Sequence, residues 1–109
     1  MTTTMNTDRL DQLRKLHAAD PGDADVAYMI AQELGKAGEH TQAIEWYDKC
    51  LDADGAYCYA YFFKAIALNA LDRKPDAIAT LNAGLVHAHQ SKHPKTISEL
   101  TGLLEQLSQ

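Results

Sequence analysis

The sequence predicts an all-α fold built from stacked pairs of antiparallel helices. The main observation is an internal repeat, because residues 24–57 and 58–91 are two copies of one 34-residue unit. The positions identical in both copies are Ala31 and Ala65, Leu34 and Leu68, Ala43 and Ala77, Ile44 and Ile78, and Leu51 and Leu85. A period of this length is typical of helix–turn–helix units that cannot bury their apolar faces singly. In addition, no segment has the alternating pattern of a strand.

Composition and charge narrow the functional classes that the chain can serve. Its 109 residues are 46% hydrophobic and 23% charged, which suits one globular domain with a modest core. The net charge of −5 disfavours nucleic acid as a partner, because phosphates need a basic stripe and the longest basic stretch covers only residues 92–95. No apolar run reaches the roughly 18 residues of a membrane span, and residues 1–6 lack the order of a signal peptide. We therefore expect a cytoplasmic protein with no membrane partner.

Three amphipathic helices are expected in the first half of the chain. They cover residues 6–19, 24–37 and 41–53. Asn6 or Thr7 is the expected N-cap of the first helix, and Asp23 is the expected N-cap of the second. Pro21 ends the first helix because proline cannot continue one, and Gly38 can take the left-handed conformation that ends the second.

Three more helices are expected in the second half. They cover residues 57–71, 75–90 and 95–107. Pro75 suits the first position of a helix, and Pro94 marks the break before the last one. The last helix carries an apolar stripe, which we expect to face the fifth helix and cap the stack. That stripe consists of Ile97, Leu100, Leu104 and Leu107, with Leu103 beside it.

Small residues recur at matching places in both copies of the repeat. They are Ala31 and Ala65 in the first helix of each copy, Ala43 and Ala77 in the second, and Cys50 and Gly84 near its end. Helix axes about 8–10 Å apart leave no room for a branched side chain where two helices cross. Large residues follow one turn after Ala43 and Ala77, namely Tyr47 and Leu81. This pattern of small and large residues resembles the tetratricopeptide repeat. The chain as a whole resembles a small bacterial-type domain protein of this family.

The resemblance implies a right-handed solenoid of antiparallel helix pairs, formed as one domain over residues 1–109. It would comprise a half repeat at 6–21, full repeats at 24–57 and 58–91, and a capping helix at 95–108 that departs from the repeat. Other departures are Ala27 and Tyr61 in place of the family's early tryptophan, and Lys64 in place of a leucine. The resemblance also implies a non-enzymatic module that binds other proteins.

The helix expected over residues 57–71 carries more aromatic side chains than one core face can use. Its core face consists of Cys58, Tyr61, Ala65 and Leu68. A second apolar face, here called the aromatic face, lies nearly opposite and consists of Tyr59, Phe62, Phe63, Ile66 and Ala70. Either neighbouring repeats cover this face or part of it opens onto a concave groove, as in the family, and the two arrangements can coexist.

The groove is the candidate binding site. By resemblance it would be lined by Tyr28, Gln32, Lys36, Tyr59, Phe62, Ile66 and Asn69. We expect it to hold a peptide or a helix of a partner protein. The lysine and asparagine clamp with which some family members grip terminal carboxylates is absent, which disfavours a chaperone-tail ligand. The alternative is a structural module that buries its aromatic face in a homodimer.

No residue pattern indicates catalysis, a metal site or a cofactor. The sequence contains no nucleophile elbow, zinc-protease motif, phosphate loop or dinucleotide fingerprint. His87, His89 and His93 do not share one helical face, so we expect them to be solvated surface residues. Cys50 is expected to be a buried, reduced thiol, although a disulfide with Cys58 can form under oxidising conditions.

Overall fold

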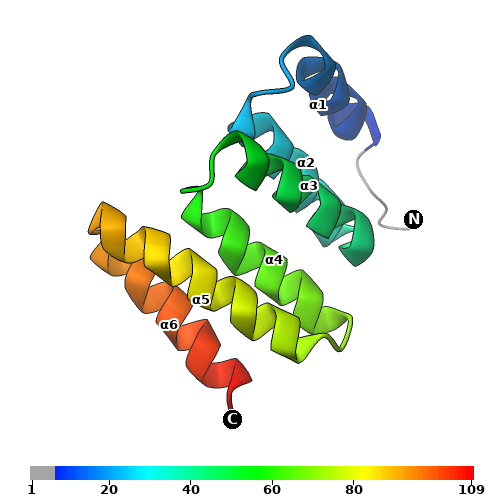
Figure 1. The fold of residues 1–109 in the computed structure, drawn as a ribbon. Helices are drawn as coiled ribbons and strands as arrows, with labels where there is room; N and C mark the ends of the chain where they lie inside the picture. Colours follow the sequence, from blue (N-terminus) through cyan, green and yellow to red (C-terminus); the bar gives the residue numbers. More distant parts are fainter. Residues whose placement is uncertain (1–6) are drawn as a thin grey trace.

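The computed structural model describes residues 7–109, and in that part of the chain it contains six α-helices and no strand. The helices are α1 (Thr7–Ala19), α2 (Ala24–Lys36), α3 (His40–Ala53), α4 (Cys58–Ala70), α5 (Lys74–Ser91) and α6 (Pro94–Leu107). Consecutive helices pack as antiparallel neighbours, and α1 and α6 lie at opposite ends of the stack (Figure 1). The predicted all-α helical-repeat fold is confirmed. The expected cap at Asn6 lies outside the described residues.

Two helix ends follow the residues expected for them. The Asp23 carboxylate accepts hydrogen bonds from the backbone N–H groups of Asp25 at 3.0 Å and Val26 at 3.3 Å, which caps α2. Gly38 has a φ of 79°, a left-handed conformation that favours glycine, and the chain turns there into α3. At the later break, Lys92 takes the left-handed conformation between α5 and α6.

Two apolar clusters form the core, and α4 contributes to both of them. The first cluster joins α1, α2 and α3 to Ala60 and Phe63 of α4. The second cluster joins Ala65 and Leu68, on another side of α4, to α5 and α6. Apolar side chains of α4 are therefore buried on two sides, as expected for a helix in the middle of a stack.

Small residues 34 positions apart are buried where the helices cross, in agreement with the register of the repeat. Ala43 and Ala77 are both fully buried, as predicted, at equivalent places in α3 and α5. Cys50 and Gly84 occupy the next equivalent places and are also buried. A Cβ atom at Gly84 would lie 2.7 Å from Cβ of Tyr61, so only glycine fits this crossing without a shift. Below, α2 and α4 are called the first helices of the two repeats, and α3 and α5 the second helices.

The last helix packs as the expected cap. Leu100 is fully buried and Leu107 is 7% exposed, and both belong to the cluster that joins α4, α5 and α6. α6 contacts both α5 and α4. It therefore has the position of a first helix, although its sequence departs from the 34-residue register.

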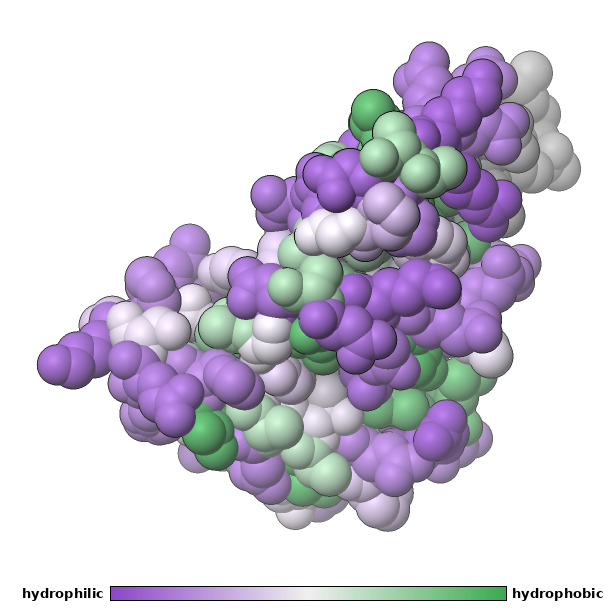
Figure 2. Space-filling model, turned by 45° about the horizontal axis from the view of Figure 1, so that its top comes forward, coloured by the Kyte–Doolittle hydropathy of each residue, from purple (hydrophilic) through white to green (hydrophobic). Residues whose placement is uncertain are grey.

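Hydrophilic and apolar side chains alternate over the face of the molecule seen in Figure 2. Figure 2 shows hydrophilic side chains over much of one face, with apolar ones gathered in several small areas. The large hydrophobic residues exposed in the described part are Leu16, Ile66, Leu71 and Val86. Lys64 on α4 places its Nζ 2.6 Å from the Asp48 carboxylate of α3. None of the helices within residues 7–109 is long and apolar enough to cross a membrane.

Candidate functional site

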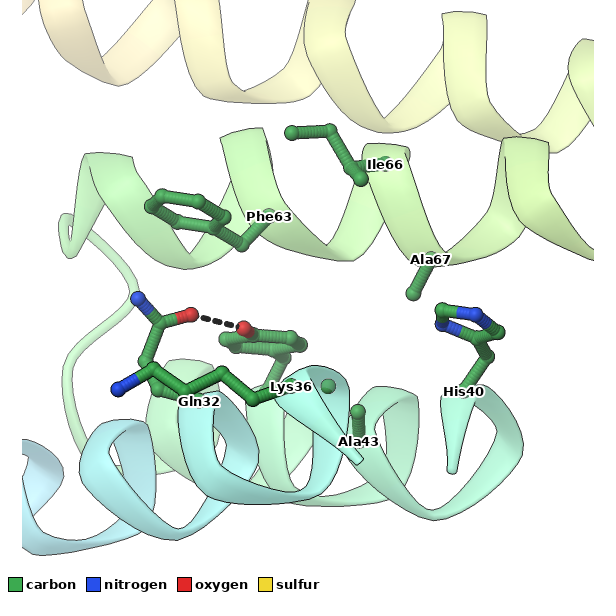
Figure 3. A pocket seen from close by; sticks show the side chains of 9 residues that line it. Gln32, Lys36, His40, Ala43, Phe63, Ile66 and Ala67 are labelled. Atoms are coloured by element: carbon green, nitrogen blue, oxygen red, sulfur yellow. Dashed lines mark hydrogen bonds between the residues drawn. The ribbon is translucent and has the colours of Figure 1, made fainter. Parts of the chain in front are cut away.

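A hollow of about 270 Å³ lies between α2, α3 and α4 (Figure 3). Side chains from α2 and α3 form one wall, and side chains from α4 form the other. The hollow, called the groove hollow below, is lined by Gln32, Gly35, Lys36, His40, Ala43, Tyr47, Phe63, Ile66 and Ala67. The site therefore lies between the two repeats rather than within one of them.

Tyr47 is the most deeply placed polar residue of the groove hollow, with 2% of its surface exposed. Its hydroxyl donates a hydrogen bond to the side-chain oxygen of Gln32, drawn as a dashed line in Figure 3. Burial raises the pKa of this hydroxyl above its ordinary value, so it stays protonated around neutral pH. The buried polar group is thereby satisfied, which leaves the interior of the hollow suited to an apolar occupant.

The α4 wall of the groove hollow is apolar. Phe63 is partly buried against the first cluster, and Ala67 is 4% exposed. Ile66 stands beside them with 40% of its surface exposed. An exposed isoleucine at the edge of an apolar hollow can bury its surface against the apolar side chain of another molecule.

Polar side chains line the opposite rim. The Lys36 side chain is 74% exposed, and its Nζ lies 3.4 Å from a carboxylate oxygen of Glu33. An exposed pair of this kind contributes little stability, so the ammonium group can turn to another acceptor. His40 begins α3 and is partly buried beside the hollow. Together with Gln32, these side chains give the rim several N–H donors.

Aromatic rings next to the groove hollow tie α2 and α3 to α4. Tyr28 is the centre of this cluster. The distances from its ring centroid are 5.0 Å to Tyr57, 6.0 Å to Tyr47 and 6.2 Å to Phe63. Phe62 then lies edge to face against Phe63 at 5.1 Å. Each such pair contributes about 0.5–1.5 kcal/mol beyond its buried area, so the walls of the hollow are held in place by their neighbours.

The structure brings four of the predicted groove residues to one place. Gln32, Lys36 and Ile66 line the groove hollow directly. Tyr28 is partly buried in the adjoining aromatic cluster, where it contacts Tyr47. These residues come from α2 and α4, the two first helices.

The other three predicted groove residues lie outside the groove hollow. The Tyr59 hydroxyl donates a hydrogen bond of 2.7 Å to the Glu99 carboxylate of α6, and this acceptor raises the pKa of the tyrosine. Phe62 packs, partly buried, against the second cluster. Asn69 is exposed near the end of α4. Much of the aromatic face is therefore engaged by contacts within the chain.

Several lining residues were not selected from the sequence. They are Gly35, His40, Ala43, Tyr47, Phe63 and Ala67. Phe63 lies three residues before Ile66, so helical spacing alone indicates that both can face one site. The α3 residues carry no comparable signal, because their approach to α4 depends on how the helices cross.

Metal-ligating side chains and the two cysteines were the other groups considered for a site within residues 7–109. Within residues 7–109, no three His, Cys, Asp or Glu side chains come together as a metal site would require. Cys50 and Cys58 are both free thiols. Burial raises the pKa of Cys50 to about 12, which keeps this thiol protonated and poorly nucleophilic near neutral pH.

Comparison with known proteins bears on the fold. No protein-family model matches the chain, and no curated protein matches it significantly. The Yersinia enterocolitica type III secretion translocator chaperone SycD is similar in structure, with a TM-score of 0.85 at 16% identity over 94% of this chain and 71% of that one. A tetratricopeptide repeat domain protein from Salinibacter ruber has a TM-score of 0.73 at 28% identity, over 81% and 89% of the two chains. The TPR2B domain of yeast Sti1, in a complex with pHsp70, has a TM-score of 0.85 at 23% identity, over 91% and 79%.

These likenesses agree with the packing of the chain itself. Two of the similar structures are tetratricopeptide repeat domains by name. The small residues that the repeat needs at its helix crossings are buried here at the expected positions. The chain therefore has the tetratricopeptide-repeat fold, with α1 as a half repeat, α2–α3 and α4–α5 as full repeats, and α6 as a capping helix.

Proposed function

We propose that this chain is a non-enzymatic interaction module that holds a peptide or a helix of a partner protein along α2 and α4. One apolar side chain of the partner enters the groove hollow and packs against Ile66 and Phe63. The observation that carries the proposal is the exposed Ile66 at the edge of an otherwise apolar hollow. Polar groups of the partner then meet the N–H donors of Gln32, Lys36 and His40 at the rim.

The groove hollow is modest in size and open to solvent, which suits a single side chain of a longer segment. Sites for drug-sized ligands or cofactors usually enclose about 300–1,000 Å³ and surround most of the ligand. The groove hollow measures about 270 Å³ and opens to solvent between the two repeats. A protruding side chain of a longer segment fits this size, with the rest of the segment lying along the helices.

Two of the similar structures support a role in binding proteins. The yeast Sti1 domain is seen in a complex with pHsp70, and SycD is a chaperone of a translocator. These are properties of those proteins, and they make a protein partner the first class to test here. The proposal for this chain rests on its own hollow.

The alternative proposal, a homodimer that buries the aromatic face, has less apolar surface to use. Tyr59 is bonded to α6, and Phe62 and Phe63 are packed against the two core clusters. The large hydrophobic residues exposed in the described part include no aromatic one. Ile66 is therefore the main apolar group that this face still offers, which favours a narrow peptide contact over a broad dimer interface.

A displayed library of random peptides tests the proposed function. Selection against the 109-residue chain should enrich peptides that share an apolar residue at one position. Ile66→Ala should weaken their binding by about tenfold or more, as expected for loss of a contact at the centre of an interface. Val86→Ala is the matched control, because Val86 is 56% exposed on α5 and does not line the groove hollow. Equal binding by the Ile66 variant would place the binding surface elsewhere.

A further inference from the structure

Lys36 is the only charged residue among the described residues that line the groove hollow, and no carboxylate belongs to that lining. The chain as a whole carries a net charge of −5. At physiological ionic strength, exposed charges are largely screened from one another beyond about 8 Å. An occupant of the groove hollow therefore responds to the charge at its rim more than to the net charge of the chain.

The two carboxylates closest to Lys36 in the sequence are already engaged. The Glu33 carboxylate lies 3.3 Å from Nε of Arg9 and 3.4 Å from Nζ of Lys36. Because Glu33 serves two cations, it compensates the charge of Lys36 only in part. The Glu39 carboxylate accepts a hydrogen bond of 3.3 Å from the side-chain amide of Gln42. With its side chain 74% exposed, Lys36 can turn from Glu33 to an acceptor on another molecule.

Three side chains with N–H donors follow one another along the α2 and α3 wall of the groove hollow (Figure 3). The oxygen of the Gln32 amide accepts the hydrogen bond of Tyr47, so Nε2 of the amide remains to serve an occupant. Lys36 lies one helical turn further along the same face of α2. His40 follows at the start of α3, and an imidazole keeps at least one N–H in either charge state. Gln32, Lys36 and His40 are called the donor row below.

The space beside the donor row suits a large apolar side chain. Phe63 and Ile66 stand on the α4 wall. Between the walls, the small residues Gly35, Ala43 and Ala67 leave room for an occupant. A large apolar side chain placed there removes its own surface, and the exposed surface of Ile66, from water. The groove hollow thus offers an apolar contact directly beside a row of donors.

We propose that the occupant of the groove hollow is an acidic segment of a partner protein, in which side-chain carboxylates flank one large apolar residue. The apolar residue packs against Phe63 and Ile66, and the carboxylates accept hydrogen bonds from the donor row. The inference rests on the proposed groove function and adds the chemical class of the partner. Hydrogen bonds to a carboxylate are about twice as strong as those between neutral groups, so the donor row favours an acidic segment over a neutral one.

The charge of Lys36 also sets the order of preference among partner segments. A basic segment would bring a second cation to Lys36, and like charges at an interface suppress the wrong partner. A neutral segment would meet neither the attraction nor the repulsion. The expected order of affinity is therefore acidic, then neutral, then basic.

Short peptides with blocked termini are the probes, and the fluorescence anisotropy of a label on each peptide is the measurement. One set has a central phenylalanine and a second set has a central leucine. The residues on both sides of the centre are glutamate, glutamine or lysine. The unmodified chain should bind the glutamate peptide about fivefold or more tightly than the glutamine peptide, and the lysine peptide most weakly. At about 0.5 M salt, the preference for glutamate should shrink.

Substitutions of Lys36 test whether this residue sets the preference. Lys36→Gln removes the charge and should abolish most of the preference for glutamate over glutamine. Lys36→Glu reverses the charge and should turn the preference toward the lysine peptide. Lys15→Glu is the matched control, because it makes the same change in net charge at an exposed residue of α1 that does not line the groove hollow. This control should keep the order of the unmodified chain, and circular dichroism should show that all three variants fold.

The outcomes separate the acidic class from the groove function on which it rests. If Ile66→Ala weakens all the peptides and the flanking residues make no difference, the groove function stands and the acidic class is wrong. The acidic class is also wrong if the lysine peptide binds best, or if Lys15→Glu changes the order as much as Lys36→Glu does. A glutamate peptide that binds only with a free C-terminus would assign the donor row to a terminal carboxylate instead. Failure of the groove function itself would appear as a displayed library that yields no peptide sensitive to Ile66→Ala.

Discussion

The two repeats fill the same helix crossing with the larger residue on opposite helices. In the first repeat, the equivalent positions carry Ala27 on the first helix and the larger Cys50 on the second, and both are buried. In the second repeat, the large residue is Tyr61 on the first helix, and it lies against Gly84 of the second. The fold thus constrains the combined size of each pair, while either helix can carry the large member.

A second difference between the repeats lies at Tyr47, which lines the groove hollow. Tyr47 reaches out between α2 and α3, and its hydroxyl is bonded to Gln32 at the border of the hollow. Its equivalent in the second repeat, Leu81, has no polar end and is fully buried. Tyr47 therefore belongs both to the core and to the lining of the groove hollow, whereas Leu81 belongs to the core alone.

The largest expected effect comes from removing the ring of Tyr47, whose equivalent in the second repeat is Leu81. Tyr47→Ala should lower the free energy of unfolding by about 3–5 kcal/mol, as for other buried aromatic rings. Tyr47→Phe keeps the ring and should lower it by about 1 kcal/mol through loss of the bond to Gln32. Chemical denaturation of both variants is the measurement. Equal losses would mean that the hydroxyl, and not the size of the ring, matters at this crossing.

A single methyl group tests the close crossing of Tyr61 and Gly84 in the second repeat. Gly84→Ala should destabilise the chain by about 1–3 kcal/mol, because its Cβ would lie 2.7 Å from Tyr61. Gly35→Ala is the matched control, because its Cβ would lie 3.9 Å from the Tyr47 hydroxyl oxygen, an ordinary contact distance. This variant should stabilise the chain by up to about 1 kcal/mol. Denaturation midpoints compare the two. A loss at Gly84 that persists in a Tyr61→Ala background would argue against the size pairing.

Substitutions of Phe62 and Ile66, two residues of the aromatic face, should have different effects on stability and on peptide binding. Phe62 packs against the second cluster, so Phe62→Ala should lower stability by about 1–3 kcal/mol. Ile66 is 40% exposed, so Ile66→Ala should lower it by less than about 1 kcal/mol while weakening peptide binding. Thermal unfolding and peptide titration of both variants are the measurements. A larger stability loss at Ile66 than at Phe62 would reverse the assignment.

The smallest expected effect is a pH dependence of stability that arises in the first repeat. Burial raises the pKa of Cys50 from 9.0 to about 12, whereas its equivalent in the second repeat is Gly84. The folded chain holds the Cys50 proton more tightly than the unfolded chain does. The contribution of this thiol to the free energy of unfolding is therefore complete below pH 9.0 and is lost as the pH rises toward about 12. Cys50→Ala should flatten the decline in stability over this window. An unchanged decline would assign it to other groups, such as the buried Tyr47.

The sequence by itself determined the all-α class, the helix order and the small residues at the crossings. Periodicity reports these features because each depends on which face of a helix must be apolar or small. Asp23 and Gly38 were likewise predictable, since a cap and a left-handed turn need particular residue types at one place. The burial of Ala43 and Ala77 followed from the same register.

Only the tertiary structure decided which side chains form the groove hollow. Tyr59 and Phe62 share a helical face with Ile66, yet they meet α6 and the second cluster while Ile66 stays exposed. Conversely, Tyr47 and His40 reach the hollow from α3, a helix on which no pattern marked them as binding residues. The physical reason is that periodicity gives the direction of a side chain from its own helix. Its neighbours depend on where the other helices cross, and that is set by packing across the whole stack.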